Sequence, residues 1–248
     1  MLGTYTEYLN QWNEQCPDKV WLREHCGDDT REWTWAEAHR EINALAVWEE
    51  SFFEGTGHCI GLLSRNRAHW YFADFGSIAA GNVVVPMFTT LAQETAEYVM
   101  SFTEMKLLFI GETENWAQVR EVLPAGIQLV CLPGVEVEDD HLKWEDIVAP
   151  HRGAMPTYQC QADDLTSLVF TSGTTGVPKG VMQTHASNII PITRFSDVFG
   201  VETGARFFSY LPLSHIAERQ IVEGSSLVNC GEVDFNENLT TLLRDLPR

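Results

Sequence analysis

The residues best suited to chemistry lie between Leu168 and His185, in the sequence LVFTSGTTGVPKGVMQTH. Glycines permit positive φ and let the backbone approach a ligand closely. Successive backbone N–H groups in such a turn form a concavity that binds anions, and threonine hydroxyls add uncharged donors. Lys179 supplies one positive charge. Because the run follows an apolar, strand-like segment, where α/β sheets present ligand sites, we predict that it binds a polyphosphate.

The spacing of this run differs from that of the common phosphate loop. The pattern GxxxxGK[ST] fails here, because Pro178 follows Gly173 at the position of the second glycine and Val181 follows Gly176. The alternative interpretation is a surface loop, rich in threonine and glycine, that binds nothing. The strand-like segment before the run and the ordered Pro-Lys-Gly after it favour a binding site.

Composition restricts the classes of protein to which the chain can belong. With 248 residues, 44% of them hydrophobic, it can bury a sizeable core as one large domain or two small ones. The formal charge of −19 and the lack of basic clusters argue against a nucleic-acid partner. Anionic lipid headgroups would repel such a surface, although a peripheral membrane contact stays open. The cysteines are scattered without a CxxC spacing, so we interpret them as reduced thiols.

No targeting or membrane-spanning segment is expected. The N-terminus lacks the basic start and apolar core of a signal peptide. The longest apolar stretches, such as GNVVVPMF, fall short of the roughly 20 residues that a membrane helix needs. We therefore expect a cytoplasmic protein.

The pattern of apolar residues predicts an α/β fold. A helix is expected over Tyr5–Gln15, two short strands around the turn near Gly27, and a helix that begins with a capping box of Thr34 and Glu37. Short apolar runs then alternate with helical segments between residues 59 and 132. Such alternation is typical of βαβ units, and it predicts a doubly wound, mostly parallel sheet with helices on both faces. The expected strands are 59–63, 83–87, 106–110 and 128–132, and the expected helices are 67–81, 92–102 and 114–123.

The second half of the chain resumes this pattern after an interruption. Residues 133–164 are acidic and contain several prolines, which is typical of a surface connection. We then expect strands over 165–170 and 206–213 and helices over 185–199 and 238–246. Pro191 is expected to kink the first of these helices.

Three stretches together resemble the AMP-forming acyl-CoA synthetases of the adenylate-forming ligase superfamily. They are FTSGTTGVPKGVMQTH, the segment NRAHWYFADFGSIAAGNVVVPMFTT (66–90), and YLPLSHIAER (210–219) in the form typical of the long-chain fatty acid branch. The resemblance spans roughly residues 3 to 248. It implies the N-terminal part of the family fold: one AMP-binding domain over 1–248, incomplete, with a first sheet region (1–150), a connection near 133–164 and a phosphate-loop region (165–248).

The resemblance also implies a two-step reaction with ATP, Mg²⁺, coenzyme A and a fatty acid. A carboxylate attacks the α-phosphorus of ATP, and the thiol of coenzyme A then displaces AMP. The matching residues would contact the phosphates, Thr171 would also lie near Mg²⁺, and Lys179 would neutralise charge. His215 would lie beside the carboxylate and the α-phosphate, and with Lys179 it is the predicted catalytic residue. The predicted phosphate-contacting residues are Thr171, Ser172, Gly173, Thr174, Thr175, Gly176, Lys179 and Gly180.

Other residues of these motifs have simpler interpretations. A lone histidine in a loop, such as His215, is usually a hydrogen-bonded structural residue, and only the surrounding motif favours a role in the site. For Glu218 and Arg219, a local ion pair and a direct role stay open. The aromatic residues between 70 and 75 could suggest a lipid groove, but their helical spacing favours a core position.

The chain departs from the family where its sequence ends. An aromatic-Gly-x-Thr-Glu motif, a ribose-binding aspartate, a hinge and a small C-terminal domain cannot be placed after Arg248. We therefore expect the N-terminal part of a long-chain fatty acid–CoA ligase, with little or no activity alone and with a sheet edge that favours self-association. The alternatives are another adenylate-forming ligase (short-chain, aryl-acid or carrier-protein-loading) and a non-catalytic nucleotide-binding module.

Overall fold

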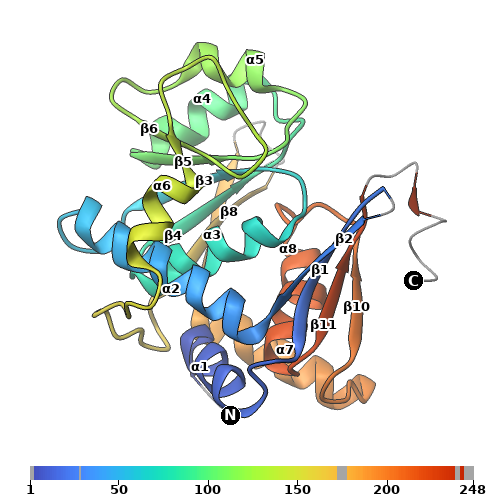
Figure 1. Ribbon diagram of the computed structural model, residues 1–248. Helices are drawn as coiled ribbons and strands as arrows, with labels where there is room; N and C mark the ends of the chain where they lie inside the picture. The colour runs from blue at the N-terminus through green and yellow to red at the C-terminus, as the bar shows by residue number, and fades with distance from the viewer. Residues whose placement is uncertain (1–2, 28, 172–177, 238–240, 243–248) are drawn as a thin grey trace.

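The computed structural model describes residues 3–27, 29–171, 178–237 and 241–242. Their elements form two β-sheets, with α3 (Ala68–Ala79) between them and α2 (Trp35–Phe52) packed along α3 (Figure 1). Two further helices, α4 (Gln93–Phe102) and α5 (Trp116–Val119), lie on the other face of the larger sheet. The prediction of mostly parallel sheets flanked by helices is therefore confirmed. No helix in the described ranges has the length and apolar character to cross a bilayer.

The larger sheet has seven strands in the order β7-β6-β5-β3-β4-β8-β9. Every neighbouring pair is parallel except β8 and β9, which form an antiparallel hairpin. The sheet ends with β7 on one side and β9 on the other, and neither of these strands was predicted. The strand bounds are β3 Cys59–Leu63, β4 Val83–Met87, β5 Leu107–Ile110, β6 Gln128–Cys131, β7 Leu142–Lys143, β8 Leu165–Thr171 and β9 Lys179–Thr184.

The smaller sheet has four strands in the order β10-β11-β1-β2. Its strands β1 (Val20–Cys26) and β2 (Asp29–Thr34) form the expected antiparallel hairpin. The unpredicted β11 (Glu232–Phe235) lies parallel to both β1 and β10 (Arg206–Ser209). The N-terminal and C-terminal parts of the chain therefore share one sheet.

Helix starts follow the local sequence closely. Helices α1 (Tyr5–Gln15) and α2 begin with capping boxes, and the predicted pair of Thr34 and Glu37 forms the second of these. Helix α7 (His185–Phe199) begins after Thr184, as expected, and includes Pro191. The remaining helical segments are short: η1 Arg120–Val122, α6 Trp144–Val148, η2 Ala149–His151, α8 Ile216–Glu218, the π-helical η3 Arg219–Gly224 and α9 Ser225–Val228.

Two predicted helices differ from the structure or cannot be compared with it. The helix expected over 114–123 is split into α5 and η1, and its first residues are not helical. The helix expected over 238–246 lies almost wholly outside the described residues. The division into regions 1–150 and 165–248 stays a prediction.

The core lies on both faces of the seven-stranded sheet. Ile60 and Leu62 of β3 belong to the cluster on the α3 side, and Leu63 belongs to the cluster on the α4 side. In the larger cluster the indole rings of Trp21 and Trp35 are stacked with centroids 4.1 Å apart. The aromatic residues predicted as core rather than lipid groove are at most 1% exposed: Trp70, Tyr71, Phe72 and Phe75. That prediction is confirmed.

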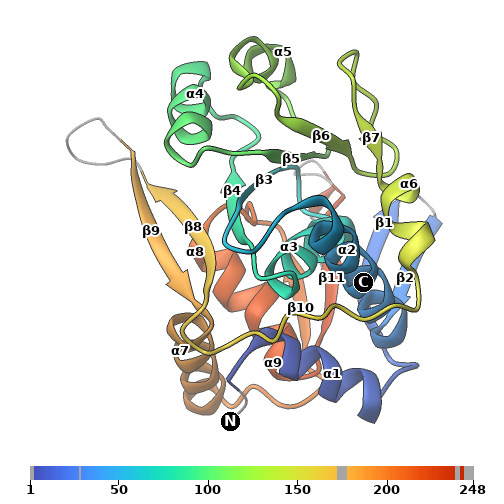
Figure 2. The ribbon, with the colours of Figure 1, turned by 90° about the vertical axis from the view of Figure 1, so that its left-hand side faces the viewer.

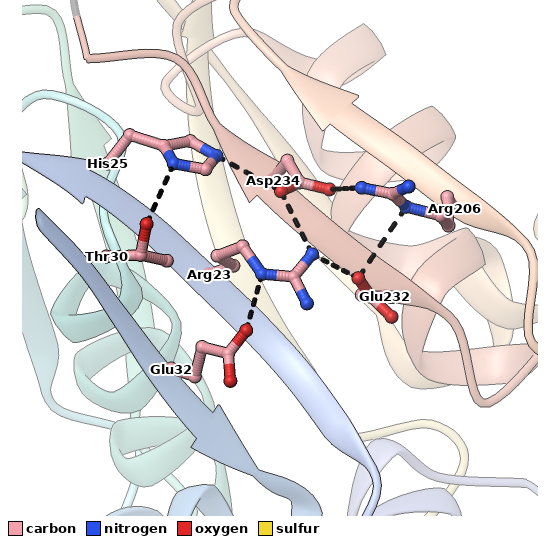
Figure 3. Close-up of polar contacts among 7 residues, drawn as sticks. All are labelled: Arg23, His25, Thr30, Glu32, Arg206, Glu232 and Asp234. Atoms are coloured by element: carbon pink, nitrogen blue, oxygen red, sulfur yellow. Dashed lines mark hydrogen bonds and ion pairs between the residues drawn. The ribbon is translucent and has the colours of Figure 1, made fainter. Parts of the chain in front are cut away.

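A cluster of hydrogen-bonded and ion-paired side chains lies on the strands of the smaller sheet (Figure 3). Asp234 of β11 accepts hydrogen bonds from Arg206 of β10 (2.9 Å) and Arg23 of β1 (3.2 Å). His25 Nε2 also lies 3.2 Å from Asp234. Burial raises the pKa of Asp234, but the two arginines outweigh it and hold that pKa below its usual value. The carboxylate therefore joins three neighbouring strands.

Glu49 of α2 is a buried carboxyl group with no exposed surface. It accepts hydrogen bonds from Ser77 Oγ (2.6 Å) and Asn82 Nδ2 (2.8 Å). Burial raises the pKa of Glu49 from 4.5 to about 7, although these hydrogen bonds act in the opposite direction. Below about pH 7, Glu49 is therefore mostly protonated in the folded chain.

We expect this group to make stability depend on pH. Its contribution is complete below pH 4.5 and is lost as the pH rises to about 7, because the folded chain then has to bury a charge. The loss amounts to about 3 kcal/mol of unfolding free energy. Denaturant unfolding across this range measures it, and Glu49→Gln should be less dependent on pH than the unchanged chain. Glu54→Gln, an exposed site just beyond α2, is the control, and equal pH slopes for all three chains would contradict the prediction.

Candidate functional site

The predicted phosphate-binding run lies on a hairpin at the edge of the larger sheet. Thr171 ends β8 and is paired with Lys179, the first residue of β9, and Phe170 is paired with Gly180. Figure 2 shows β9 beside β8, with α7 following it. Because β8 is parallel to β4, the Thr171 end of the hairpin lies at the carboxyl edge of the parallel strands, where α/β sheets bind ligands. The predicted residues Ser172, Gly173, Thr174, Thr175 and Gly176 lie outside the described residues.

The described residues of this run are exposed on the two strands. Thr171 Oγ1 donates a hydrogen bond to the backbone oxygen of Lys179 at 3.4 Å. Lys179 is exposed, and no ion pair joins it to another described residue. A Cβ atom on Gly180 would lie 3.0 Å from Leu168 Cδ1 and 3.3 Å from Phe170 Cζ. Gly180 therefore has a packing role within the hairpin, and its predicted phosphate contact stays a prediction.

His215 is the N-cap residue of α8 and is exposed. The backbone N–H of Ala217 donates to His215 Nδ1 at 3.1 Å. A backbone N–H can only donate, so Nδ1 has no proton in this arrangement and the proton lies on Nε2. The ring is thereby oriented with one nitrogen toward its own helix, and Nε2–H is left as a hydrogen-bond donor.

The loop before His215 reaches the same edge of the larger sheet as the hairpin. Leu213 N donates to the side chain of Asn66 at 2.9 Å, and Asn66 lies just beyond the carboxyl end of β3. In the sheet order, β3 and β8 are separated only by β4. Two strand spacings correspond to about 10 Å. The fold therefore brings the hairpin and the His215 loop to one edge, although they are far apart in sequence.

Glu218 and Arg219 do not form the local ion pair that was left open above. Glu218 accepts hydrogen bonds from Ser209 Oγ (2.8 Å) and Tyr210 N (3.1 Å). Burial raises the pKa of Glu218 to about 7, although these hydrogen bonds lower it. Arg219 donates two hydrogen bonds to Asp74 of α3, at 2.8 and 2.9 Å. Both residues therefore fix the helical segment after His215.

Asp74 is a residue that the sequence interpretation missed. Its side chain has no exposed surface and lies in a helix whose residues are all buried. A carboxylate in such a segment needs a buried partner, because the desolvation of an unpaired charge is costly. That signal was present in the run WYFADF, which has one acidic residue among apolar ones. The sequence alone does not identify Arg219 as the partner of Asp74, because the two residues are far apart along the chain.

Of the described residues, no three His, Cys, Asp or Glu side chains come together as a metal site. Mg²⁺ that is bound with phosphates needs few protein ligands, because phosphate oxygens and water supply most of its coordination. The hydroxyl of Thr171 donates its hydrogen to the backbone oxygen of Lys179 and keeps its oxygen lone pairs, which are compatible with such a contact. The predicted role of Thr171 in metal binding stays a prediction.

The fold of the chain matches the N-terminal domain of adenylate-forming ligases. The anthranilate CoA ligase AuaEII, in complex with anthranoyl-AMP, superposes with a TM-score of 0.87 and 21% identity over 98% of this chain and 46% of that chain. Acetoacetyl-CoA synthetase from Streptomyces lividans superposes with a TM-score of 0.82 and 20% identity over 94% of this chain and 38% of that chain. At these identities, the likeness shows the fold alone.

The sequence places the chain in a family. Residues 9–245 match the family described as AMP-binding enzyme, and the chain belongs to it. It is 30% identical to long-chain-fatty-acid–CoA ligase ACSBG2 of Xenopus laevis over 66% of this chain and 24% of that protein. It is 27% identical to long-chain-fatty-acid–CoA ligase 1 of Homo sapiens over 83% of this chain and 32% of that protein. The chain thus spans about a quarter to a third of the length of these relatives.

We expect the ion pair of Asp74 and Arg219 to be essential for stability. Arg219→Met should lower the unfolding free energy by about 3–5 kcal/mol, because it leaves a buried carboxylate without its partner. The double variant Asp74→Asn/Arg219→Met should lose less than the sum of the single changes. Arg120→Met, which removes the ion pairs of a partly exposed arginine with Glu138 and Asp139, should change the unfolding free energy by only about 1 kcal/mol or less. Equal effects of Arg219→Met and Arg120→Met in denaturant unfolding would contradict this assignment.

Proposed function

We propose that this chain is the phosphate-binding part of an AMP-forming ligase that activates long-chain fatty acids for transfer to coenzyme A. The observation that supports the proposal is the hairpin of β8 and β9. It pairs Thr171 with Lys179 at the carboxyl edge of the larger sheet, the edge that the His215 loop also reaches. The exposed residues Lys179 and His215 then lie at the same edge of the larger sheet.

The first step of such a reaction joins two anions, and this is its main physical obstacle. A fatty acid carboxylate has to approach the α-phosphorus of ATP, and pyrophosphate leaves. Lys179 would offset the charge of the β- and γ-phosphates, and the residues between Thr171 and Lys179 would supply donors. His215 would donate its Nε2–H to the carboxylate or to an α-phosphate oxygen. Oriented donors of this kind stabilise developing charge without reorganisation during the reaction. Mg²⁺ bound to ATP would neutralise further phosphate charge.

The relatives in sequence support the proposed class of substrate. The sequence relatives compared above are long-chain-fatty-acid–CoA ligases by name, and the aligned residues cover most of this chain. The structural neighbours include ligases for anthranilate and acetoacetate, at lower identity. We therefore propose a long-chain fatty acid, with ATP and coenzyme A as the other substrates. An aryl or short-chain acid is the second candidate, favoured by the close fit of the fold to those neighbours.

Pyrophosphate binding tests the role of the hairpin. Lys179→Ala should weaken the binding of magnesium pyrophosphate, measured by isothermal titration calorimetry, by about tenfold to a hundredfold, because a charge-assisted contact is lost. Lys106→Ala is the matched control, since Lys106 is exposed at the opposite, amino end of β5 in the same sheet. If the unchanged chain bound no pyrophosphate, or if both variants bound it equally, the proposal would be wrong.

A carboxylate titration tests the role of His215. Octanoate, a soluble fatty acid, should shift the ring ¹⁵N signals of His215 in the chain saturated with pyrophosphate, because its carboxylate accepts a hydrogen bond from Nε2–H. The signals are assigned by their loss in His215→Ala. Octanol has a similar chain without the carboxylate and should cause no shift. A response to octanol as large as that to octanoate would contradict a carboxylate contact.

A further inference from the structure

The side chain of Asn66 makes three contacts, one with the last residue of β10 and two with the loop that leads to His215. Its Nδ2 donates to Ser209 Oγ at 2.9 Å and to the backbone oxygen of Leu211 at 2.6 Å. Its Oδ1 accepts from the backbone N–H of Leu213 at 2.9 Å. Because a primary amide has two donor hydrogens and one acceptor oxygen, this set uses both ends of the side chain. No other natural side chain of this length has the same donors and acceptor.

The contacts extend past the loop to the helix that begins at His215. Ser209 Oγ accepts from Asn66 and donates to Glu218 at 2.8 Å, so one hydroxyl connects the amide with α8. Glu218 is 2% exposed and also accepts from Tyr210 N. Asn66 therefore reaches the segment before His215 directly and the segment after it through Ser209.

His215 lies between these two anchored segments. Its backbone N–H donates to Pro212 O at 2.8 Å, and its ring nitrogen Nδ1 accepts from Ala217 N. Leu213, which Asn66 holds, lies within this turn and is 1% exposed. The orientation of the imidazole thus depends on a turn that one amide joins to the end of β3.

We propose that Asn66 is a positioning residue for His215: it fixes the turn before α8 at the carboxyl end of β3, and so directs Nε2–H of the ring toward the phosphate-binding edge. The catalytic consequence of this positioning rests on the proposed function. Asn66 acts through the loop and makes no contact with reactants in this assignment. The hydrogen bonds to Leu211 and Leu213 use both the donor and the acceptor of the amide, and neither alanine nor aspartate can form both of them.

Hydrogen exchange and ring nitrogen signals test the proposal on the full chain. In Asn66→Ala, the amide of Leu213 should exchange about tenfold faster, because its hydrogen-bond acceptor is gone. At about pH 8.5, where an ordinary imidazole is neutral, the two ring ¹⁵N signals of His215 should be well separated in the unchanged chain. They should move toward each other in Asn66→Ala, since the ring is then free to exchange between tautomers.

Two further variants separate positioning from general stability. Asn66→Asp keeps an acceptor for Leu213 N but loses the donors to Leu211 and Ser209, so it should preserve protection at Leu213 better than alanine does while still changing the ring signals. Arg65→Ala removes the neighbouring surface ion pairs with Glu112 and Glu114, and it should change neither measurement. If Asn66→Ala does not fold, Asn66→Asp provides the decisive ring measurement.

The outcomes distinguish this inference from the proposed function. Unchanged His215 ring signals in both folded Asn66 variants, or in Asn66→Asp alone where alanine does not fold, would overturn the positioning role, even if pyrophosphate still bound at the hairpin. A change of the same size in the His215 ring signals of Arg65→Ala would also overturn the positioning role. Pyrophosphate binding should stay within about twofold in the Asn66 variants, because the hairpin is untouched. If the unchanged chain bound no pyrophosphate, the proposed function would be wrong, and the positioning of the loop by Asn66 would still hold.

Discussion

The buried ion pair between Arg219 and Asp74 is the interaction on which the arrangement of the site depends. Asp74 lies in α3, the helix between the two sheets, and Arg219 begins the π-helical turn that follows α8. Glu223 lies 3.8 Å from the same guanidinium group, so one cation lies between two buried acidic side chains. Burial and the charge of Asp74 raise the pKa of Glu223 well above its usual value, although Arg219 opposes this. The helical segment that begins at His215 is thereby fixed to the centre of the molecule.

This ion pair is important because the carboxyl edges of the two sheets meet at the site. Strand β10 of the smaller sheet ends at Ser209, and β3 of the larger sheet ends just before Asn66. The side chains of these two residues are hydrogen-bonded to each other. The loop that carries His215 therefore starts from one sheet and rests on the other. Any change in the distance between the sheets would move the imidazole relative to the hairpin.

Local signals in the sequence were sufficient for much of the fold. The capping box of Thr34 and Glu37 and the short apolar strands such as 59–63 depend on neighbouring residues only, and the structure has them where expected. Strands β9 and β11 depend on partners far away in sequence. The side chains of β9 are mostly exposed because it is an edge strand, so its sequence lacks the pattern of a buried strand. Strand β11 has four residues, two of them acidic, and its place between β1 and β10 is set by pairing.

The difference between local signals and long-range contacts also applies to the candidate site. The motif predicted Thr171, Lys179 and His215 as site residues, and the structure has the hairpin and the His215 loop at one edge of the sheet. It did not identify Asp74 or the contacts of Asn66, because these join residues that are separated by more than a hundred positions. The roles of these side chains can be recognised only in the folded structure, where their partners lie beside them.

The buried carboxyl group of Glu49 has a consequence for calorimetry. Between pH 4.5 and about 7 the folded chain holds a proton there that the unfolded chain releases. The buffer takes up that proton whenever the chain melts, so the measured heat includes the ionisation heat of the buffer. Scans in phosphate and in an amine buffer at the same pH would then yield different apparent enthalpies for one and the same transition.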